Sequence, residues 1–172
     1  MAEITLRVAK PGDARFIAEV HVAAWRAAYR GLMPDDFLAA LSVDERTVMW
    51  SRMLSRPSPS QLAVSEIDGA LAGFCSYGPT RDDPSPELAE IYALNVHPDR
   101  WRQGAGRALC EHAYREAATR GHTLITLWVM SGNTRARHFY ELLGYAADGT
   151  ARSNRDLIGH PFDELRYRKV IA

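Results

Sequence analysis

The stretch from residue 87 to residue 129 constrains the fold most, because it predicts a strand, a helix and a second strand in direct succession. An apolar run, Leu88 to Val96, ends at His97-Pro98 and leads into a glycine-containing turn. Apolar residues at helical spacing then run from Gly106 to Arg120, and a second apolar run covers Thr123 to Val129. Such a βαβ unit predicts that its two strands pair in parallel.

Further strands and helices are predicted on both sides of this unit. Strand-like runs occupy residues 4–9, 61–67, 70–77, 145–148 and 162–170, and Asp68-Gly69 is a strong hairpin signal between two of them. Helices are predicted over residues 13–31, 34–41, 42–54 and 133–143, with Asp13 and Ser42 as helix caps. Residues 80–86 and 149–161 are predicted loops. Seven strands and four or five helices predict one α/β (α+β) sheet domain over residues 1–172.

The composition restricts the partners of the chain. Its 21 basic and 21 acidic side chains cancel, so no overall field draws nucleic acid or an anionic membrane surface to it. Cys75 and Cys110 lie in a strand-like and a helix-like run, which favours buried reduced thiols over a disulfide framework. No secretory segment and no apolar stretch of about 18 residues is found. We expect a soluble, cytoplasmic protein without nucleic-acid, membrane or metal partners, and a homodimer is left open.

The turn after the first apolar run predicts an anion site. The first backbone N–H groups of a helix have no intrahelical partner and the helix dipole is positive there, so phosphate oxygens bind where small residues let the backbone come close. Gly104, Ala105 and Gly106 are small, and Arg102 and Arg107 add positive charge. A P-loop would need a Gly-Lys-Ser/Thr ending, and a dinucleotide fingerprint would need a third glycine and a later acidic residue. Neither is present.

Two motifs resemble those of the GCN5-related N-acetyltransferases (the GNAT family). The segment Arg102-Gln103-Gly104-Ala105-Gly106-Arg107, which follows a strand ending in Val96-His97-Pro98, resembles the pyrophosphate loop of that family. Trp101 departs from the pattern, because the family usually has Arg or Gln there. The segment from Asn133 to Tyr145 matches the pattern Asn-x-x-Ala-x-x-x-Tyr-x-x-x-Gly-Phe/Tyr at each fixed position. Its Asn, Ala and Tyr recur at three-to-four-residue intervals and so share one helix face.

The resemblance covers nearly the whole chain and implies a mixed sheet whose fourth and fifth strands splay apart to hold acetyl-CoA, the co-substrate. It implies that Asn133 contacts pantetheine-side groups, that the Tyr140 hydroxyl lies near the thioester sulfur, and that a bulge near residues 94–96 turns backbone groups towards the pantetheine arm. The acetyl-CoA-binding residues that it implies are Leu94, Asn95, Val96, Arg102, Gln103, Gly104, Ala105, Gly106, Arg107, Asn133, Ala136 and Tyr140.

An N-acetyltransferase must remove a proton from its acceptor. A lysine-like amine has a pKa near 10.4, so its deprotonation at pH 7 costs about 4.6 kcal/mol. Glu90, placed by strand alternation on the face of Tyr92, Leu94 and Val96, is the preferred catalytic base, and His21 and Glu19 are its rivals. The alternative for Glu90 is a carboxylate at a strand end that faces solvent or pairs with an arginine. Tyr140 is the expected acid for the leaving thiolate, with the Val96 backbone N–H polarising the carbonyl. A packed thiol in a helix makes a covalent route through Cys110 unfavourable, so direct transfer is expected.

The acceptor side is less defined by the sequence. Trp25 and Tyr29, four residues apart, share a helix face that is either ordinary core or, by the resemblance, a substrate-binding wall. Enzymes of the family that acetylate protein N-termini commonly have Leu-Glu-Val-Arg where this chain has Leu127-Trp128-Val129-Met130, and Trp128 cannot be a base. This favours the primary amine of a small molecule or amino compound as acceptor. A protein or peptide acetyltransferase, acting on an N-terminus or a lysine, and a non-catalytic acetyl-CoA-binding module are the alternatives.

Overall fold

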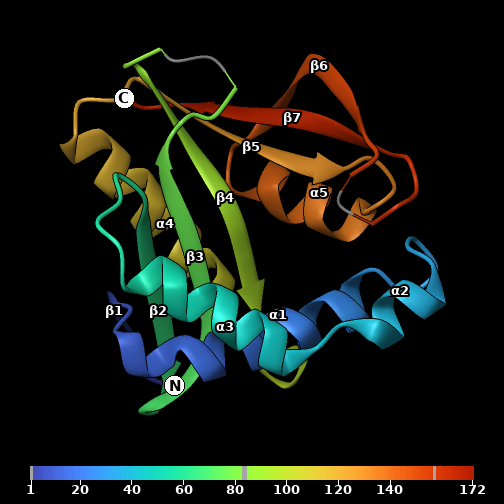
Figure 1. The fold of residues 1–172 in the computed structure, drawn as a ribbon. Coiled ribbons are helices and arrows are strands. Elements are labelled where there is room, and N and C mark those ends of the chain that lie inside the picture. Colours follow the sequence, from blue (N-terminus) through green and yellow to red (C-terminus); the bar gives the residue numbers. More distant parts are fainter. Residues whose placement is uncertain (1, 83–84, 157) are drawn as a thin grey trace.

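A computed structural model describes residues 2–82, 85–156 and 158–172, which form a seven-stranded mixed sheet with helices against both of its faces (Figure 1). The predicted α/β class, the strand number and the five α-helices are confirmed in the described part of the chain. The elements in chain order are β1 (Ile4–Val8), α1 (Ala14–Ala28), α2 (Asp35–Ala40), α3 (Val43–Leu54), β2 (Gln61–Ile67), β3 (Ala70–Pro79), β4 (Leu88–Val96), α4 (Ala105–Thr119), β5 (Leu124–Met130), α5 (Thr134–Leu142), β6 (Ala146–Asn154) and β7 (Phe162–Val170), with short 3-10 turns at Pro11–Asp13 and Pro98–Arg100.

The sheet has the strand order β1-β2-β3-β4-β5-β7-β6. β4 and β5 pair in parallel, as the βαβ unit predicts, and the other neighbours are antiparallel. The β2–β3 hairpin turns at Asp68 and Gly69, whose φ angles of 49° and 78° are both positive, as a tight turn of the I′ type requires. Local turn chemistry and hydrophobic pattern therefore agree on this part of the fold.

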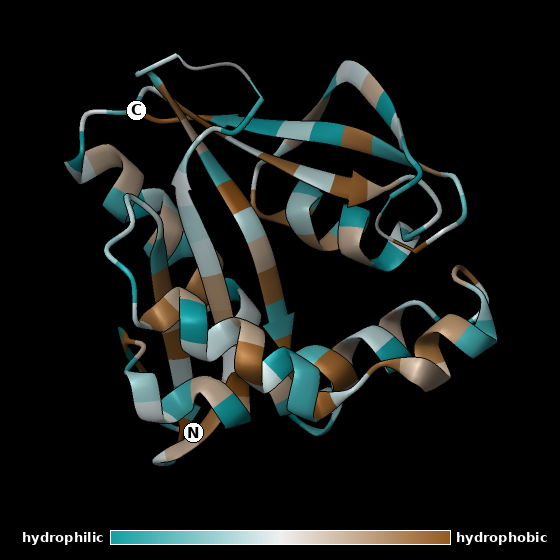
Figure 2. Cartoon of the chain, viewed as in Figure 1, coloured by the Kyte–Doolittle hydropathy of each residue, from teal (hydrophilic) through white to brown (hydrophobic). Residues whose placement is uncertain are grey.

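Two hydrophobic clusters hold the helices to the sheet. α4 buries Leu109, Cys110 and Ala113 against one face, together with Tyr140 of α5. α1 and α3 pack on the other face, where Ile17 and Trp50 meet strand residues such as Phe74. In Figure 2 the hydrophobic segments concentrate in the central strands, while the helices carry both kinds of residue. Apolar burial of this kind contributes roughly 25 cal/mol per Å² and is the main stabilising term.

β4 and β5 separate halfway along their length. Their pairing covers Leu88 to Ile91 of β4 and ends at Leu127 of β5, and the two strands diverge from there (Figure 1). The β3–β4 register also shifts at this point, because Ser76 pairs with Ala93 while Tyr77 pairs with Ile91. Tyr92 is thus the extra residue of a β-bulge, which bends β4 away from its neighbour.

The bulge corrects two predictions. It lies at Tyr92 and not at residues 94–96, whose pairing with β3 is regular. An extra residue also reverses the alternation of side chains beyond it. Glu90 pairs with Gly78 and shares its face with Ala93 and α1, whereas Leu94 and Val96 pack with the cluster on the α4 face. Glu90 therefore does not share a face with Leu94 and Val96.

Two predicted loops differ in part from the structure. β6 continues through Gly149 to Asn154, with an irregular register against β7, so the predicted loop 149–161 is a strand over its first half. Residue 157 of that loop lies outside the described residues. In the loop 80–86, residues 83 and 84 also lie outside them. No helix among the described residues has both the length and the apolarity to cross a membrane.

A third hydrophobic cluster borders the splay. It joins Val22 of α1 and Met33 after it, Leu38 of α2, Met130 at the end of β5, and Ile158 between β6 and β7. Segments that are far apart in the sequence therefore meet over the diverging strands. We call this cluster the roof.

Candidate active site

A cavity of about 890 Å³ occupies the splay between β4 and β5. Residues from α1, β4, the start of α4, β5, α5 and β7 line it. Because β4 and β5 no longer pair there, backbone groups along this edge are available to a ligand. Of the residues that the resemblance implies for acetyl-CoA, those that line the cavity are Leu94, Asn95, Val96, Arg102, Gly104, Gly106, Arg107, Asn133, Ala136 and Tyr140.

The turn before α4 has the geometry of an anion site. Gly104 has a φ of 94° and caps the helix, and Arg102 before it has a φ of 61°. A Cβ on Gly104 would lie 2.9 Å from the Cδ1 of Ile4, whose side chain would have to shift, and the positive φ itself disfavours any side chain at this position. Gln103 and Ala105 do not line the cavity. Gln103 donates to the Asp99 carbonyl at 3.1 Å, and Ala105 is buried in the core.

Trp101, the departure from the family pattern, has a structural role in this turn. Its indole N–H donates to the Val96 carbonyl at 2.8 Å, which fixes the turn to the end of β4. The guanidinium of Arg135 lies over its ring, 3.4 Å from the centroid. Burial lowers the pKa of Arg135, and nearby Arg102 adds to that shift. Arg135 and Arg100 also line the cavity, so this end has more positive charge than the motif alone predicts.

The predicted residues of α5 lie on the cavity wall. Asn133 is the N-cap of the helix, and its side-chain oxygen accepts from the Ala136 N–H at 3.1 Å. Tyr140 is almost fully buried and packs edge-on against Phe139 and Tyr145. Burial raises the pKa of Tyr140 well above its ordinary value, with smaller contributions from Cys110, Cys75 and Tyr29. Its phenol therefore keeps its proton near neutral pH.

Both cysteines are buried free thiols. Burial raises the pKa of Cys110 to about 11, and its Sγ donates to the Tyr145 hydroxyl at 3.6 Å. Burial also raises the pKa of Cys75 well above its usual range. A thiol that stays protonated is a poor nucleophile. Neither residue lines the cavity.

The three candidate bases lie in different surroundings. Glu90 is 1% exposed, and its carboxylate accepts the backbone N–H of Arg81 at 2.8 Å and its guanidinium at 2.6 Å. His21 lies in the core, where its Nδ1 accepts from the Trp50 indole at 3.2 Å and burial lowers its pKa to about 4. Glu19 pairs with Arg15 on the surface. None of the three lines the cavity.

Trp25 and Tyr29 belong both to the core and to the cavity wall. Their rings are 5.1 Å apart, they pack against the roof, and both line the cavity. Burial raises the pKa of Tyr29 to about 12, and the negative charge of Glu164 contributes to that shift. The two interpretations of these aromatic residues are therefore not exclusive.

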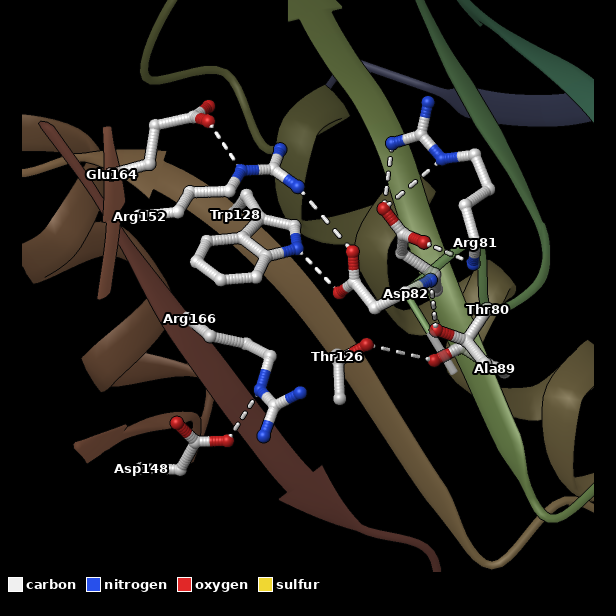
Figure 3. Close-up of polar contacts among 11 residues, drawn as sticks. Thr80, Arg81, Asp82, Ala89, Thr126, Trp128, Asp148, Arg152, Glu164 and Arg166 are labelled. Carbon is white, nitrogen blue, oxygen red and sulfur yellow. Dashed lines mark hydrogen bonds and ion pairs between the residues drawn. The ribbon is translucent and has the colours of Figure 1, made fainter. Parts of the chain in front are cut away.

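Several residues that complete this side of the cavity were not among the predicted site residues. Trp128 of β5 and Glu164 of β7 line it together with Tyr92, Phe162 and Met33. Trp128 donates its indole N–H to Asp82 at 2.6 Å, and the Arg152 guanidinium lies over its ring at 4.0 Å (Figure 3). The only signal for Glu164 is its register opposite Met130, which depends on the β5–β7 pairing.

Known proteins resemble this chain over most of its length. The Acetyltransferase (GNAT) family model matches residues 15–145. An uncharacterized N-acetyltransferase of Bacillus subtilis, YuaI, is 32% identical over 94% of this chain and 90% of that protein. The L-amino acid N-acyltransferase MnaT of Escherichia coli is 25% identical over 83% of this chain and 79% of that protein. The PaiA N-acetyltransferase of Thermoplasma acidophilum, solved with coenzyme A, has a TM-score of 0.75 at 18% identity and covers 98% of this chain and 99% of its own.

Proposed function

The chain belongs to the GNAT acetyltransferase family, and from that membership we propose that it transfers the acetyl group of acetyl-CoA directly to the primary amine of a small molecule. Membership makes the chain an acyltransferase with acetyl-CoA as its co-substrate. We further propose that the acceptor is a small molecule and that single residues have the roles given below.

One observation carries this proposal: a single cavity joins a basic helix turn, a buried phenol and an aromatic wall. Gly104, Arg102 and Arg107 at the start of α4 suit the pyrophosphate of acetyl-CoA, because backbone N–H groups and positive charge converge there. Tyr140 lines the same cavity as this turn and the aromatic residues of α1. A thioester that extends from the turn along α5 would therefore bring its sulfur towards Tyr140.

The chemistry assigned to these residues is a direct displacement. The neutral amine attacks the thioester carbonyl, a C–N bond forms, and the C–S bond breaks. Tyr140 donates a hydrogen bond and then its proton to the departing sulfur, and the proton that the new amide nitrogen loses restores the phenol. Glu90 accepts the proton of the ammonium group through a water molecule, since it lies behind the cavity wall. The raised pKa values of Cys75 and Cys110 support direct transfer over an acetyl-cysteine intermediate.

The roof favours a small acceptor over a peptide. A peptide would need an open groove beside the splay, but Met33, Leu38 and Ile158 pack together over that end with Met130. Opening the roof would expose these buried side chains, and full exposure of one such side chain costs about 1.5–3 kcal/mol. A small amine needs no such opening, because a cavity of about 890 Å³ is already present and Met33 and Met130 of the roof line it.

A panel of acceptors tests the proposal. The enzyme is incubated with acetyl-CoA and either aliphatic amines, arylalkylamines, free amino acids or short peptides, and the release of free CoA is measured. We expect release with small amines and little with peptides that have the same N-terminal residue. Faster turnover of the peptides would favour the protein acetyltransferase alternative, and binding of acetyl-CoA without release for any acceptor would favour the non-catalytic module.

A further inference from the structure

The charged residues that line the cavity are divided between the two faces of the sheet. Among the described lining residues, four are arginines and one is acidic; the arginines are Arg100, Arg102, Arg107 and Arg135, and the acid is Glu164. The arginines belong to the turn before α4, to the first turn of α4 and to α5, on one face. Glu164 lies opposite Met130 of β5 and shares its face of the sheet. Met130 packs in the roof with Trp25 and Tyr29 of α1, so Glu164 lies on the α1 face. The cavity is therefore basic at one end and acidic at the other.

Glu164 is held in place by an arginine that it shares with a second carboxylate. Its side chain is 12% exposed, and its Oε2 accepts from Arg152 Nε at 2.7 Å (Figure 3). Arg152 also pairs with Asp82 at 3.3 Å, so one guanidinium serves two carboxylates. The stack of Arg152 on Trp128 fixes the guanidinium further. This group of three has a net charge of −1, and Glu164 is the member that lines the cavity.

Two other arginines, near Glu164 and Trp128, already have carboxylate partners. Arg81 pairs with Glu90 at 2.6 Å, and Arg166 pairs with Asp148 at 2.6 Å. Neither they nor Arg152 line the cavity. A carboxylate on the acceptor would thus be repelled by the negative charge of Glu164, and no lining arginine would offset that repulsion at this end. A cation would meet a favourable charge and an aromatic wall, which is a good environment for an ammonium group on an apolar body.

We propose that Glu164 binds the ammonium group of the acceptor and that the acceptor is a primary amine on an aromatic or apolar body without a carboxylate. This inference rests on the proposed function, because it assigns the substrate class of the same site. At pH 7 such an amine is a cation before it loses its proton. Glu164 determines specificity by binding the cationic form of the acceptor. Glu90 remains the proposed base that removes the proton.

The test compares three acceptors of similar size: 2-phenylethylamine, which is a cation at pH 7; L-phenylalanine, which adds a carboxylate; and aniline, which is uncharged. The wild-type enzyme should prefer 2-phenylethylamine over L-phenylalanine by at least about 10-fold in kcat/KM. Glu164→Gln should raise the KM for 2-phenylethylamine roughly 10- to 100-fold, the range of a hydrogen bond to a charged group. Its KM values for aniline and for acetyl-CoA should change less than about threefold.

Three further variants separate charge from structure. Asp163→Asn removes the same charge from the neighbouring, exposed position of β7 and should change none of the constants. Glu164→Asp keeps the charge and should retain part of the preference for the cation. Glu90→Gln should lower kcat, not the preference for cations.

Different results overturn different claims. A preference for L-phenylalanine, or an unchanged KM for 2-phenylethylamine in Glu164→Gln, would overturn the assignment of Glu164. An equal rise in KM for aniline would show that Glu164 only supports the fold of the site. If none of the amines tested caused the wild-type enzyme to release CoA, the proposed function itself would fail.

Discussion

Tyr140 shows how one buried residue can serve both packing and chemistry. Its ring packs between Phe139 and Tyr145, and its hydroxyl is the proposed donor to the leaving sulfur. Tyr140→Phe keeps the ring and removes the donor, so kcat should fall roughly 10²- to 10⁴-fold while the Kd for acetyl-CoA stays nearly constant. Steady-state kinetics with a calorimetric Kd checks this. A change in kcat of less than about threefold would assign the proton to another group.

The pH profile gives a second readout for Tyr140. The acid form of a group is lost as the pH rises through its pKa, and burial raises the pKa of Tyr140 well above its ordinary value of about 10. The rate should therefore rise with pH as the amine becomes neutral, and it should show no fall caused by Tyr140 below about pH 10. A descending limb near pH 8 or 9 that is absent in Tyr140→Phe would contradict the raised pKa.

At the level of single residues, the sequence predicted the α5 residues that line the cavity but not its acidic residue, Glu164. Asn133, Ala136 and Tyr140 line the cavity because a helix face follows directly from sequence spacing. Glu164 could not be found in this way. It lies among other charged residues of β7, and only the pairing with β5, together with the closure by α1, brings it to the cavity.

At the scale of elements, the proposed binding of pyrophosphate by the turn into α4 can be tested with a variant that does not strain the backbone. A Cβ on Gly106 would lie 3.5 Å from Phe139, an ordinary contact, whereas Gly104 has a positive φ and a neighbour at 2.9 Å. Gly106→Glu is therefore the better variant, because it places a carboxylate near the proposed pyrophosphate position without strain at φ. Acetyl-CoA at about 100 times its Kd should stabilise the wild-type fold by about 2.7 kcal/mol.

The melting temperature measures this effect with and without acetyl-CoA. Gly106→Glu should abolish the upward shift that acetyl-CoA causes. Ala118→Glu adds the same charge near the far end of α4, where the residue is exposed, and should leave the shift intact. An unchanged shift in Gly106→Glu would place the pyrophosphate elsewhere.

Element boundaries followed the sequence where local signals are strong. The hairpin at Asp68-Gly69 and the cap at Ser42, whose Oγ accepts from the Glu45 N–H at 3.2 Å, are local features and were predicted. The bulge at Tyr92 and the extension of β6 were not. Both depend on how a strand pairs with its neighbour, and a register shift leaves no mark in the pattern of one strand.

For the whole molecule, the cavity predicts the order of events in catalysis. The basic turn and Glu164 line one continuous space, so both substrates can be bound before transfer. Initial rates measured against both substrates should give intersecting double-reciprocal lines. Parallel lines, or an acetyl group trapped on Cys75 or Cys110, would contradict direct attack.

The early end of the β4–β5 pairing leaves part of each strand without a neighbouring strand on that side. Beyond Ile91 and Leu127 the two strands no longer bond to each other, so each presents an open edge inside the protein. An extended amide-containing chain such as pantetheine can take the place of a missing strand and accept or donate those backbone bonds. The protein thus folds with a gap in its own sheet. We expect the pantetheine arm of acetyl-CoA to fill this gap and to bond to the open strand edges.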